Sequence, residues 1–454
     1  MEQKQRIVII GAGLAGCLLA SKLAKNHEVI LIYSEKTPSL RWKDHLTPAI
    51  RSLSGGLGGS TLLWHNALME IEQTTLRNDW LKPLKLDHYI KEAAALFGLS
   101  LERERKQHEV QKKRISKFFK GNKIRLGQPL FVPKNKINAA TFLNSEDIQI
   151  LKQTIVNYKY QGNTITHAVS NDGEKIKGDI FVDCTGGIGI LSTLRSLISH
   201  SKSLTYEEHL CGFLGHVSLK KNIGFDFFLN KAQSKGWHTR YALEYKTDEG
   251  WSIALYLRPH YRAINQNYNV SLDNFYRYEG SFSFKKILRL LFTPSRIAAA
   301  LFTKFGIYIP TKTFSIYAVY QHPTAQGRIV QNTDDVLLQV NHSQNLRRYT
   351  GQAFEALTHY FGNHLNSSLY DDKAPDRLTT GAHFSSSIPI GNDSQSVSNT
   401  LQLNGYKNIY VCSGAVLPET SYANTGLTIV ALALRLADQL SPKESCIKMD
   451  EKHS

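Results

Sequence analysis

The sequence predicts an α/β protein of two interleaved domains, and three observations support this. A continuous apolar run at Arg6–Ile10 is followed at once by glycines, as expected of a buried parallel strand that enters a tight turn. A second strand-like segment that ends in glycines lies far downstream, at 177–187. Alternating stretches at Trp251–Leu257 and Phe314–Tyr320 are typical of half-buried antiparallel strands. We therefore expect a discontinuous Rossmann-type domain and an interleaved α+β domain built on an antiparallel sheet.

Length and composition agree with this fold class. A chain of 454 residues is too long for a single hydrophobic core and suits two domains. The hydrophobic fraction of 42% and the charged fraction of 20% are typical of soluble globular proteins. No apolar run is long enough for a membrane-spanning helix, and the first strand begins too early to leave room for a signal peptide. We expect a cytoplasmic protein.

The cysteines indicate neither disulfides nor a metal. They are five in number, and no CxxC pair occurs among Cys17, Cys184, Cys211, Cys412 and Cys446. Without such spacing a structural zinc site or a disulfide framework is not supported. We therefore predict no metal site, and we expect Cys17, Cys184 and Cys412 to act as small buried hydrophobic residues.

The net charge of +17 is partly local. Twelve Lys and Arg lie between Arg103 and Lys136, against the two acids Glu104 and Glu109. Such a run forms either a solvated face or a surface for an anionic partner, which would be an acidic substrate, a membrane surface or a protein. No recognisable nucleic-acid module accompanies the charge, so we expect no nucleic-acid partner. The oligomeric state is not predicted.

The turn after the first strand has the pattern of a dinucleotide-binding loop. Gly11, Gly13 and Gly16 form G-x-G-x-x-G, with Leu14 and Ala15 inside it, and a helix is expected over Cys17–Ala24. Glycine permits the tight turn and the close approach of a pyrophosphate, which the helix N-terminus binds through its amides. A second strand at Glu28–Tyr33 completes the unit.

The residue that holds the ribose is less clear. The acidic residue expected at the end of the second strand is replaced by Tyr33. Glu35 either takes that role or is an exposed loop acid.

The downstream segment contains two predicted strands, Asn163–Val169 and Lys177–Asp183, followed by Thr185, Gly186 and Gly187. Glycines at the end of a strand let the backbone approach a nucleotide closely. Two separated segments of this kind favour FAD over a nicotinamide cofactor.

Four further segments resemble the bacterial sugar-oxidising branch of the glucose–methanol–choline (GMC) oxidoreductase family. They are GGLGGSTLLWHNAL (Gly55–Leu68), WLKPLKLDHYIKEAAALFGL (Trp80–Leu99), TGAHFSSSIPIG (Thr380–Gly391) and the segment from Asn408 to Leu440, with a weaker similarity in HPTAQGRI (His322–Ile329). The resemblance implies the domain division. An FAD-binding domain would comprise 1–75, 150–212 and 395–454, and a substrate-binding domain 76–149 and 213–394.

The resemblance also implies how FAD is bound. Gly58, Gly59 and Ser60 would pack backbone amides against it, beside Trp64. Where relatives attach FAD covalently, a histidine often precedes this tryptophan, and here that position is Leu63, so we predict non-covalent FAD; His65 is the weaker alternative for attachment. Further contacts would come from Gly414, Ala415, Gly426 and Leu427, with a helix over Gly426–Leu440 pointing its N-terminus at the flavin.

His383 and Asn424 match the catalytic pair of the family. The implied reaction is oxidation of a CH–OH group of a sugar or a secondary metabolite. His383 would remove the hydroxyl proton while hydride passes to flavin N5, and Asn424 would hold the oxygen.

The sequence also departs from the family pattern. The usual His-His-x-Gly-Thr is replaced by His383 to Ser387, Asn-Pro by Asn424-Thr425, and Arg-Met by Pro389-Ile390. One alternative is therefore a redox-neutral flavin reaction on the same fold, such as an isomerisation, elimination or decarboxylation. Another is a binding protein that retains only the scaffold.

The segment Phe282–Ile309 contains two apolar helical stretches with interleaved Lys and Arg. It is either a packed helix pair or a peripheral membrane contact that favours anionic lipid.

Overall fold

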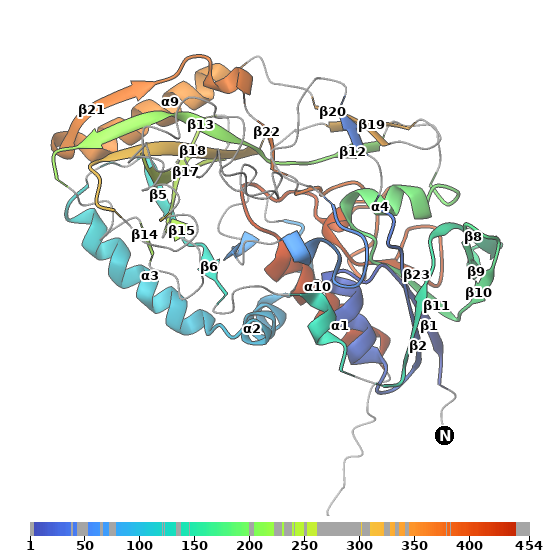
Figure 1. Ribbon diagram of the computed structural model, residues 1–454. Helices are drawn as coiled ribbons and strands as arrows, with labels where there is room; N and C mark the ends of the chain where they lie inside the picture. Colours follow the sequence, from blue (N-terminus) through green and yellow to red (C-terminus); the bar gives the residue numbers. More distant parts are fainter. Residues whose placement is uncertain are drawn as a thin grey trace, which may run out of the picture.

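The computed structural model gives the fold directly. It describes residues 4–37, 40–42, 53–63, 67–71, 79–119, 121, 123–132, 138–144, 146–198, 204–221, 229–230, 238–239, 241–248, 252–260, 301, 309–321, 327–331, 336–340, 345–377, 379–381 and 383–441. The fold class is α/β, with a parallel sheet and a separate antiparallel sheet, as the sequence predicts (Figure 1).

A five-stranded parallel sheet forms the first layer, in the order β23-β11-β1-β2-β7. Its strands are β1 (Arg6–Ile10), β2 (Glu28–Tyr33), β7 (Ile148–Lys152), β11 (Ile180–Asp183) and β23 (Ile409–Val411). The apolar run of β1 is central and almost fully buried, which explains why it lacks alternation. The sheet thus takes strands from all three segments assigned to the first domain, and β7 begins two residues before the predicted boundary at 150.

Two helices cover this sheet near its glycine turn. They are α1 (Leu14–Leu23) and α10 (Gly426–Leu440), which pack against each other, and α10 also packs on α2 (Asp87–Leu96). The helix α1 begins three residues earlier than predicted, with Gly13 as its N-cap. The predicted helix Gly426–Leu440 is confirmed, and ten of its residues are buried.

The predicted strand Lys177–Asp183 is divided in the structure. Residues Lys175–Lys177 form β10, which joins β8 (Ile155–Gln161) and β9 (Thr164–Ser170) in a three-stranded antiparallel sheet. Only 180–183 enter the parallel sheet as β11. The chain turns at Gly178, where a Cβ would lie 2.7 Å from the Val8 side chain.

The second layer is a seven-stranded antiparallel sheet in the order β21-β13-β18-β17-β16-β5, with β22 also on β13. The strands are β5 (Ile124–Gly127), β13 (Leu210–Leu219), β16 (Ala242–Lys246), β17 (Ser252–Pro259), β18 (Thr313–Gln321), β21 (Leu365–Tyr370) and β22 (Thr379–Thr380). The predicted strands at 251–257 and 314–320 correspond to β17 and β18.

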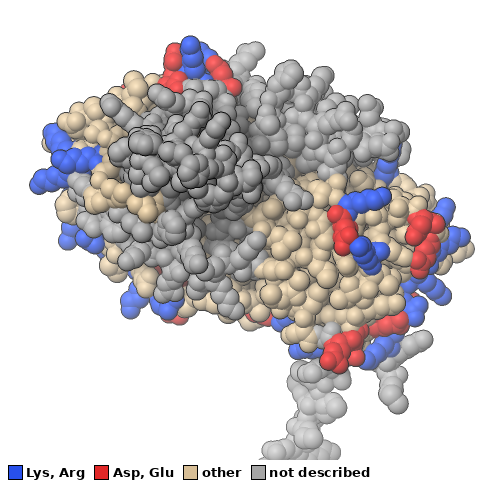
Figure 2. All heavy atoms as spheres, viewed as in Figure 1, with Lys and Arg blue, Asp and Glu red and all other residues tan. Residues whose placement is uncertain are grey.

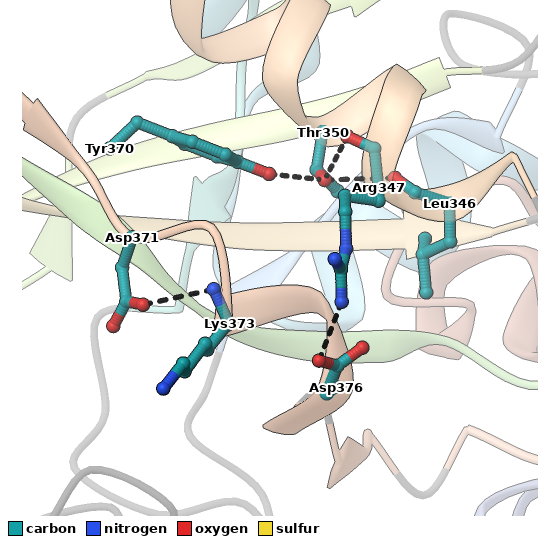
Figure 3. Close-up of polar contacts among 7 residues, drawn as sticks. All are labelled: Leu346, Arg347, Thr350, Tyr370, Asp371, Lys373 and Asp376. Atoms are coloured by element: carbon teal, nitrogen blue, oxygen red, sulfur yellow. Dashed lines mark hydrogen bonds and ion pairs between the residues drawn. The ribbon is translucent and has the colours of Figure 1, made fainter.

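Helix α9 (Leu346–Phe361) covers one face of this sheet and closes a second hydrophobic core (Figure 1). Phe354 and Leu357 from the helix lie in the same core cluster as Leu255 of β17. Polar contacts hold the N-terminal part of the helix (Figure 3). The hydroxyls of Thr350 and Tyr370 lie 3.0 Å apart, and Arg347 pairs with Asp376 at 2.7 Å. Each sheet therefore has its own core.

The remaining elements are short, apart from α3. A four-stranded sheet has the order β12-β19-β20-β3, so that β3, near the start of the chain, pairs with a strand about 300 residues later. The elements not yet given are β3 (Leu40–Trp42), β4 (Ala67–Leu68), β6 (Leu130–Phe131), β12 (Leu204–Tyr206), β14 (Leu229–Asn230), β15 (His238–Thr239), β19 (Gly327–Gln331), β20 (Val336–Val340), α3 (Leu101–Ser116), α4 (Gly186–Thr193) and the 3-10 helices 59–63, 82–84, 139–142, 362–364, 374–377 and 414–416.

Half of the twelve basic residues of this run lie on α3, whose charged residues are mostly exposed. Some of them form ion pairs, as Lys112 does with Glu109 on the same helix and Arg105 with the more distant Glu70. On the face shown in Figure 2, most of the visible Lys and Arg lie toward the edge of the molecule and others lie within the tan surface, several of them beside acidic side chains. This pattern agrees with a solvated face.

Other predictions lie partly beyond the described residues. Apart from Leu301 and Ile309, the segment 282–309 lies outside them, as does Cys446, so the proposed lipid contact stays a prediction. Within the described residues, no helix is long and apolar enough to cross a membrane. Cys17, Cys184, Cys211 and Cys412 are buried free thiols.

Candidate functional site

A cavity of about 830 Å³ lies where the glycine turn, the 53–61 loop, the start of α4 and the start of α10 meet. Its size is in the range of cofactor and ligand sites. Most of the predicted site residues line it: Gly11, Gly13, Leu14, Ala15, Gly59, Ser60, Thr185, Gly186, Gly187, His383, Gly414, Asn424 and Gly426. Segments more than 400 residues apart in the chain therefore form one site.

The three glycines of the first turn have different structural roles. Gly11 has φ +100°, and a Cβ there would lie 2.6 Å from the backbone of Cys184. A Cβ on Gly16 would lie 1.8 Å from the Gly11 carbonyl oxygen, so this glycine permits helix–strand packing. A Cβ on Gly13 would have no atom within 4 Å. Because Gly13 also lines the cavity, its missing side chain leaves room for a ligand.

The N-terminus of α1 is suited to an anion. Gly13 caps the helix without a side-chain hydrogen bond, and the first turn contains no acidic residue. The first amides of such a helix have no intrahelical acceptor, and the helix dipole favours negative charge there. A phosphate group in the cavity would therefore meet free N–H groups.

Glu35 lies outside the cavity lining. Its carboxylate pairs with Lys152 at 2.7 Å, and its side chain is 60% exposed. Tyr33, Ser34, Lys36 and Thr37 line this part of the cavity instead. The structure thus places Glu35 as an exposed loop acid, the second of the two roles that its sequence position allows.

The 55–60 loop lines the cavity through Gly55, Gly56, Gly59 and Ser60 but not through Gly58. The Gly58 amide donates to the Ala12 carbonyl at 2.9 Å, and its φ of +93° favours glycine. Gly58 therefore ties the loop to the first turn. Leu63 lines the cavity, whereas Trp64 and His65 lie outside the described residues.

The β11–α4 turn is fixed by Asp183, which is fully buried. Its carboxylate accepts hydrogen bonds from the hydroxyls of Thr185 (2.6 Å), Tyr158 (3.1 Å) and Thr193. Burial raises the pKa of this carboxyl group, and the hydrogen bonds from Thr185, Thr193 and Tyr158 act in the opposite direction. The result is a fixed backbone at the cavity edge.

The two glycines of this turn differ. Gly186 has φ +88°, and a Cβ there would meet nothing within 4 Å. A Cβ on Gly187 would lie 2.2 Å from the carbonyl oxygen of Phe384. Gly186 thus leaves cavity space, while Gly187 allows the segment of His383 to pack closely against α4.

The N-terminus of α10 is a second helix start at the cavity. Thr425, Gly426 and Ile429 line it, and the first turn contains no acidic residue and no side-chain cap. Ala415 and Leu427, predicted to contact the cofactor, are buried behind this wall and do not line the cavity.

His383 lies in a bulge. The backbones of Glu207 and Ser385 exchange two hydrogen bonds (2.9 and 3.0 Å), and Leu210 pairs with Thr380. Four residues, 381–384, therefore lie opposite only two, 208 and 209. Bulges of this kind re-aim a side chain, and here His383 lines the cavity.

His209 is a residue that sequence reasoning missed. It is 1% exposed, and its ring centroid lies 4.9 Å from that of His383. Burial lowers the pKa of His209 well below its usual value, and the charge of His383 lowers it further. His209 follows the acidic pair Glu207-Glu208 just before β13, and this local sequence contains no pattern that indicates a contact with His383. The contact depends on a long-range pairing between two segments.

Among the described residues, no cluster of His, Cys, Asp or Glu could hold a metal ion. The fold and the cavity define a two-domain α/β protein with a dinucleotide-type site and a histidine–asparagine pair at the same cavity.

Comparisons with known proteins agree with this class. Residues 320–433 match the family model described as GMC oxidoreductase, in its C-terminal domain. This segment contains His383, Asn424 and the start of α10. The C-terminal part of the chain is thus similar to the corresponding part of GMC oxidoreductases. A search of curated proteins found no match.

Solved structures show the same fold over nearly the whole chain. The crystal structure of pyridoxine 4-oxidase from Mesorbium loti is similar with a TM-score of 0.57 and 14% sequence identity, covering 96% of this chain and 99% of that one. At this identity the similarity establishes the fold.

Proposed function

We propose that the whole chain is a GMC-type, FAD-dependent oxidoreductase that oxidises a CH–OH group. One observation carries the proposal: the glycine turn of β1–α1 and the pair His383 and Asn424 line the same cavity. A dinucleotide site alone would fit many functions, whereas this pair beside it fits proton removal coupled to hydride transfer.

The residues of the cavity fit FAD in most respects. The absent side chains of Gly13 and Gly186 leave room for a ligand, and the start of α1 offers amides to a pyrophosphate. The ribose would be held without Glu35, by polar residues such as Ser34 and Thr37 that line the cavity beside Tyr33. Leu63 offers no nucleophile for a covalent link, which supports non-covalent binding.

In the proposed reaction, FAD held in the cavity would supply the acceptor for the hydride of the substrate carbon. His383 accepts the hydroxyl proton of the substrate as the hydride leaves, since a neutral imidazole is a suitable base near neutral pH. Asn424 donates a hydrogen bond to the substrate oxygen and orients it. The N-terminus of α10, which begins at the cavity, would stabilise the negative charge that a flavin gains when it is reduced.

The redox-neutral alternative receives less support. It was motivated by the altered residues after His383, but Ser386 and Ser387 bind backbone. Ser387 donates to the Gly187 carbonyl at 2.5 Å, and Ser386 to that of Pro418 at 3.4 Å. Of the altered positions, Phe384 and Thr425 line the cavity, and neither is an acid or a base.

The substrate class is best tested directly. Purified protein should be yellow, and denaturation with acid should release the flavin into the supernatant. Anaerobic bleaching of the flavin is then measured with sugars, polyols, hydrophobic alcohols and pyridoxine, the last because of the similar oxidase. Bleaching by at least one alcohol in wild type, but not in His383→Ala, is expected. A flavin-free protein, or bleaching that His383→Ala matches in rate, would contradict the proposal.

A further inference from the structure

The segments that carry His383 and Asn424 meet at a third side chain. His209 lies immediately before β13, in the stretch opposite the bulge of His383. Its carbonyl oxygen accepts a hydrogen bond from the Gly381 amide at 2.6 Å. A Cβ on residue 381 would lie 3.1 Å from the Cβ of His209, so glycine allows this close approach.

On its ring side, His209 contacts both segments. Its ring is tilted by 52° against the ring of His383. Its Nε2 lies 3.4 Å from the hydroxyl oxygen of Thr420, which is fully buried and precedes Asn424 by four residues. Between them, Ser421 has φ +50°, an unusual backbone conformation for a residue other than glycine. His209 therefore packs between the bulge and the loop that leads to Asn424.

We propose that His209 is a positioning residue, which holds His383 and the 420–424 loop in the arrangement required for proton removal. This inference rests on the proposed function. His209 is not expected to exchange protons itself, because it is 1% exposed and the Thr420 hydroxyl beside its Nε2 belongs to a residue that is itself fully buried. A neutral ring in contact with His383 orients the base without competing for the proton.

Electrostatics supports this role. Burial is the largest cause of the lowered pKa of His209, followed by the charge of His383, while a hydrogen bond with the Ser421 backbone opposes them. When His383 takes up a proton, a second charge on His209 would be repelled. His209 thus stays neutral through the reaction.

Two variants separate positioning from proton transfer. In His209→Gln, an uncharged side chain can still form a hydrogen bond with Thr420, so flavin reduction should remain within a few-fold of wild type with the same pH profile. In His209→Phe, the hydrogen bond is lost, and reduction should slow by roughly 10- to 100-fold, the effect of a misplaced catalytic group. The substrate dissociation constant should change little. His27→Gln, which removes another buried histidine that does not line the cavity, is the matched control.

A readout without substrate accompanies the kinetics. In the flavin-loaded protein labelled with ¹⁵N-histidine, the His209 signals, assigned by their loss in His209→Gln, should show no protonation near pH 6.5. Titration of His209 near that value, or loss of an ionisation from the rate profile in His209→Gln, would overturn the neutral role. An unchanged reduction rate in His209→Phe would overturn the positioning role. If no alcohol reduces the wild type, the proposed function fails, while the titration still tests the state of His209.

Discussion

The two walls of the cavity are built in different ways. The wall formed by the β1–α1 turn and the β11–α4 turn presents mainly backbone, with space where Gly13 and Gly186 lack side chains. The other wall presents the side chains of His383 and Asn424, and the segment of His383 is held by pairing with the distant strand β13. The first wall should therefore be sensitive to any added side chain, and the second to the loss of particular functional groups.

The largest expected effect is at Gly13. In Gly13→Val the new side chain points into the cavity, so the protein should fold but contain no flavin. Gly16→Val is the contrasting variant, because its side chain would meet the Gly11 carbonyl and should prevent correct folding. Circular dichroism together with the visible spectrum distinguishes the two. A yellow Gly13→Val protein would refute the assignment of the first wall.

On the second wall, His383→Ala should leave flavin content and fold unchanged. Flavin reduction should slow by roughly 10²- to 10⁴-fold, the typical contribution of a general base. Stopped-flow bleaching with an active alcohol is the measurement. A loss of flavin instead would show that the two walls are not separable.

The effect at Asn424 should be smaller. Asn424→Ala removes one orienting hydrogen bond, so its cost in the barrier should be about 1–3 kcal/mol. The same stopped-flow experiment gives the value. If Asn424→Ala raised the barrier as much as His383→Ala does, Asn424 would contribute more to the reaction than orientation of the substrate.

The second wall should also weaken on acidification. The pKa of His209 is lowered in the folded protein, so below the ordinary value of 6.5 the unfolded chain binds a proton that the folded one excludes. The free energy of unfolding is therefore unaffected by His209 above pH 6.5. Below this pH it falls, by at most about 1.4 kcal/mol per pH unit, because the buried ring must stay neutral. His27 and His108 act in the same direction. Melting temperatures between pH 5 and 8 should therefore decline less steeply in His209→Gln.

The smallest effect is expected at Glu35. Glu35→Gln should leave flavin affinity within about twofold of wild type, since the carboxylate faces Lys152 and not the cavity. Fluorescence titration of the apoprotein with FAD measures this. A large loss of affinity would restore Glu35 as the ribose ligand.

The sequence predicts the first wall better than the second. The order β1–α1–β2 follows from local patterns: an apolar run, a glycine turn and helical periodicity. Gly187 carries the same local signal as Gly186, yet it serves packing against Phe384. Both glycines line the cavity, but which of the two leaves space there depends on tertiary contacts, and a local pattern does not contain these.

The parts that escaped prediction depend on long-range pairing. Strand β7 was not expected, and it adds to β2 in parallel across more than 100 residues. Likewise, β3 pairs with β20, and His209 meets His383 across the bulge. Short strands of this kind gain their stability from partners rather than from intrinsic propensity, so that their own sequence gives little signal.

The order of the parallel sheet has a consequence for when the proposed cofactor could bind. Strand β23 and helix α10 come from residues 409–440, whereas the strands beside them were synthesised more than 200 residues earlier. Pairings of such long range form late in folding, because loop closure must precede the contacts that reward it. During synthesis, the glycine turn is therefore made well before the residues that complete the second wall of the cavity. Under the proposed function, FAD would therefore bind only to the nearly finished chain.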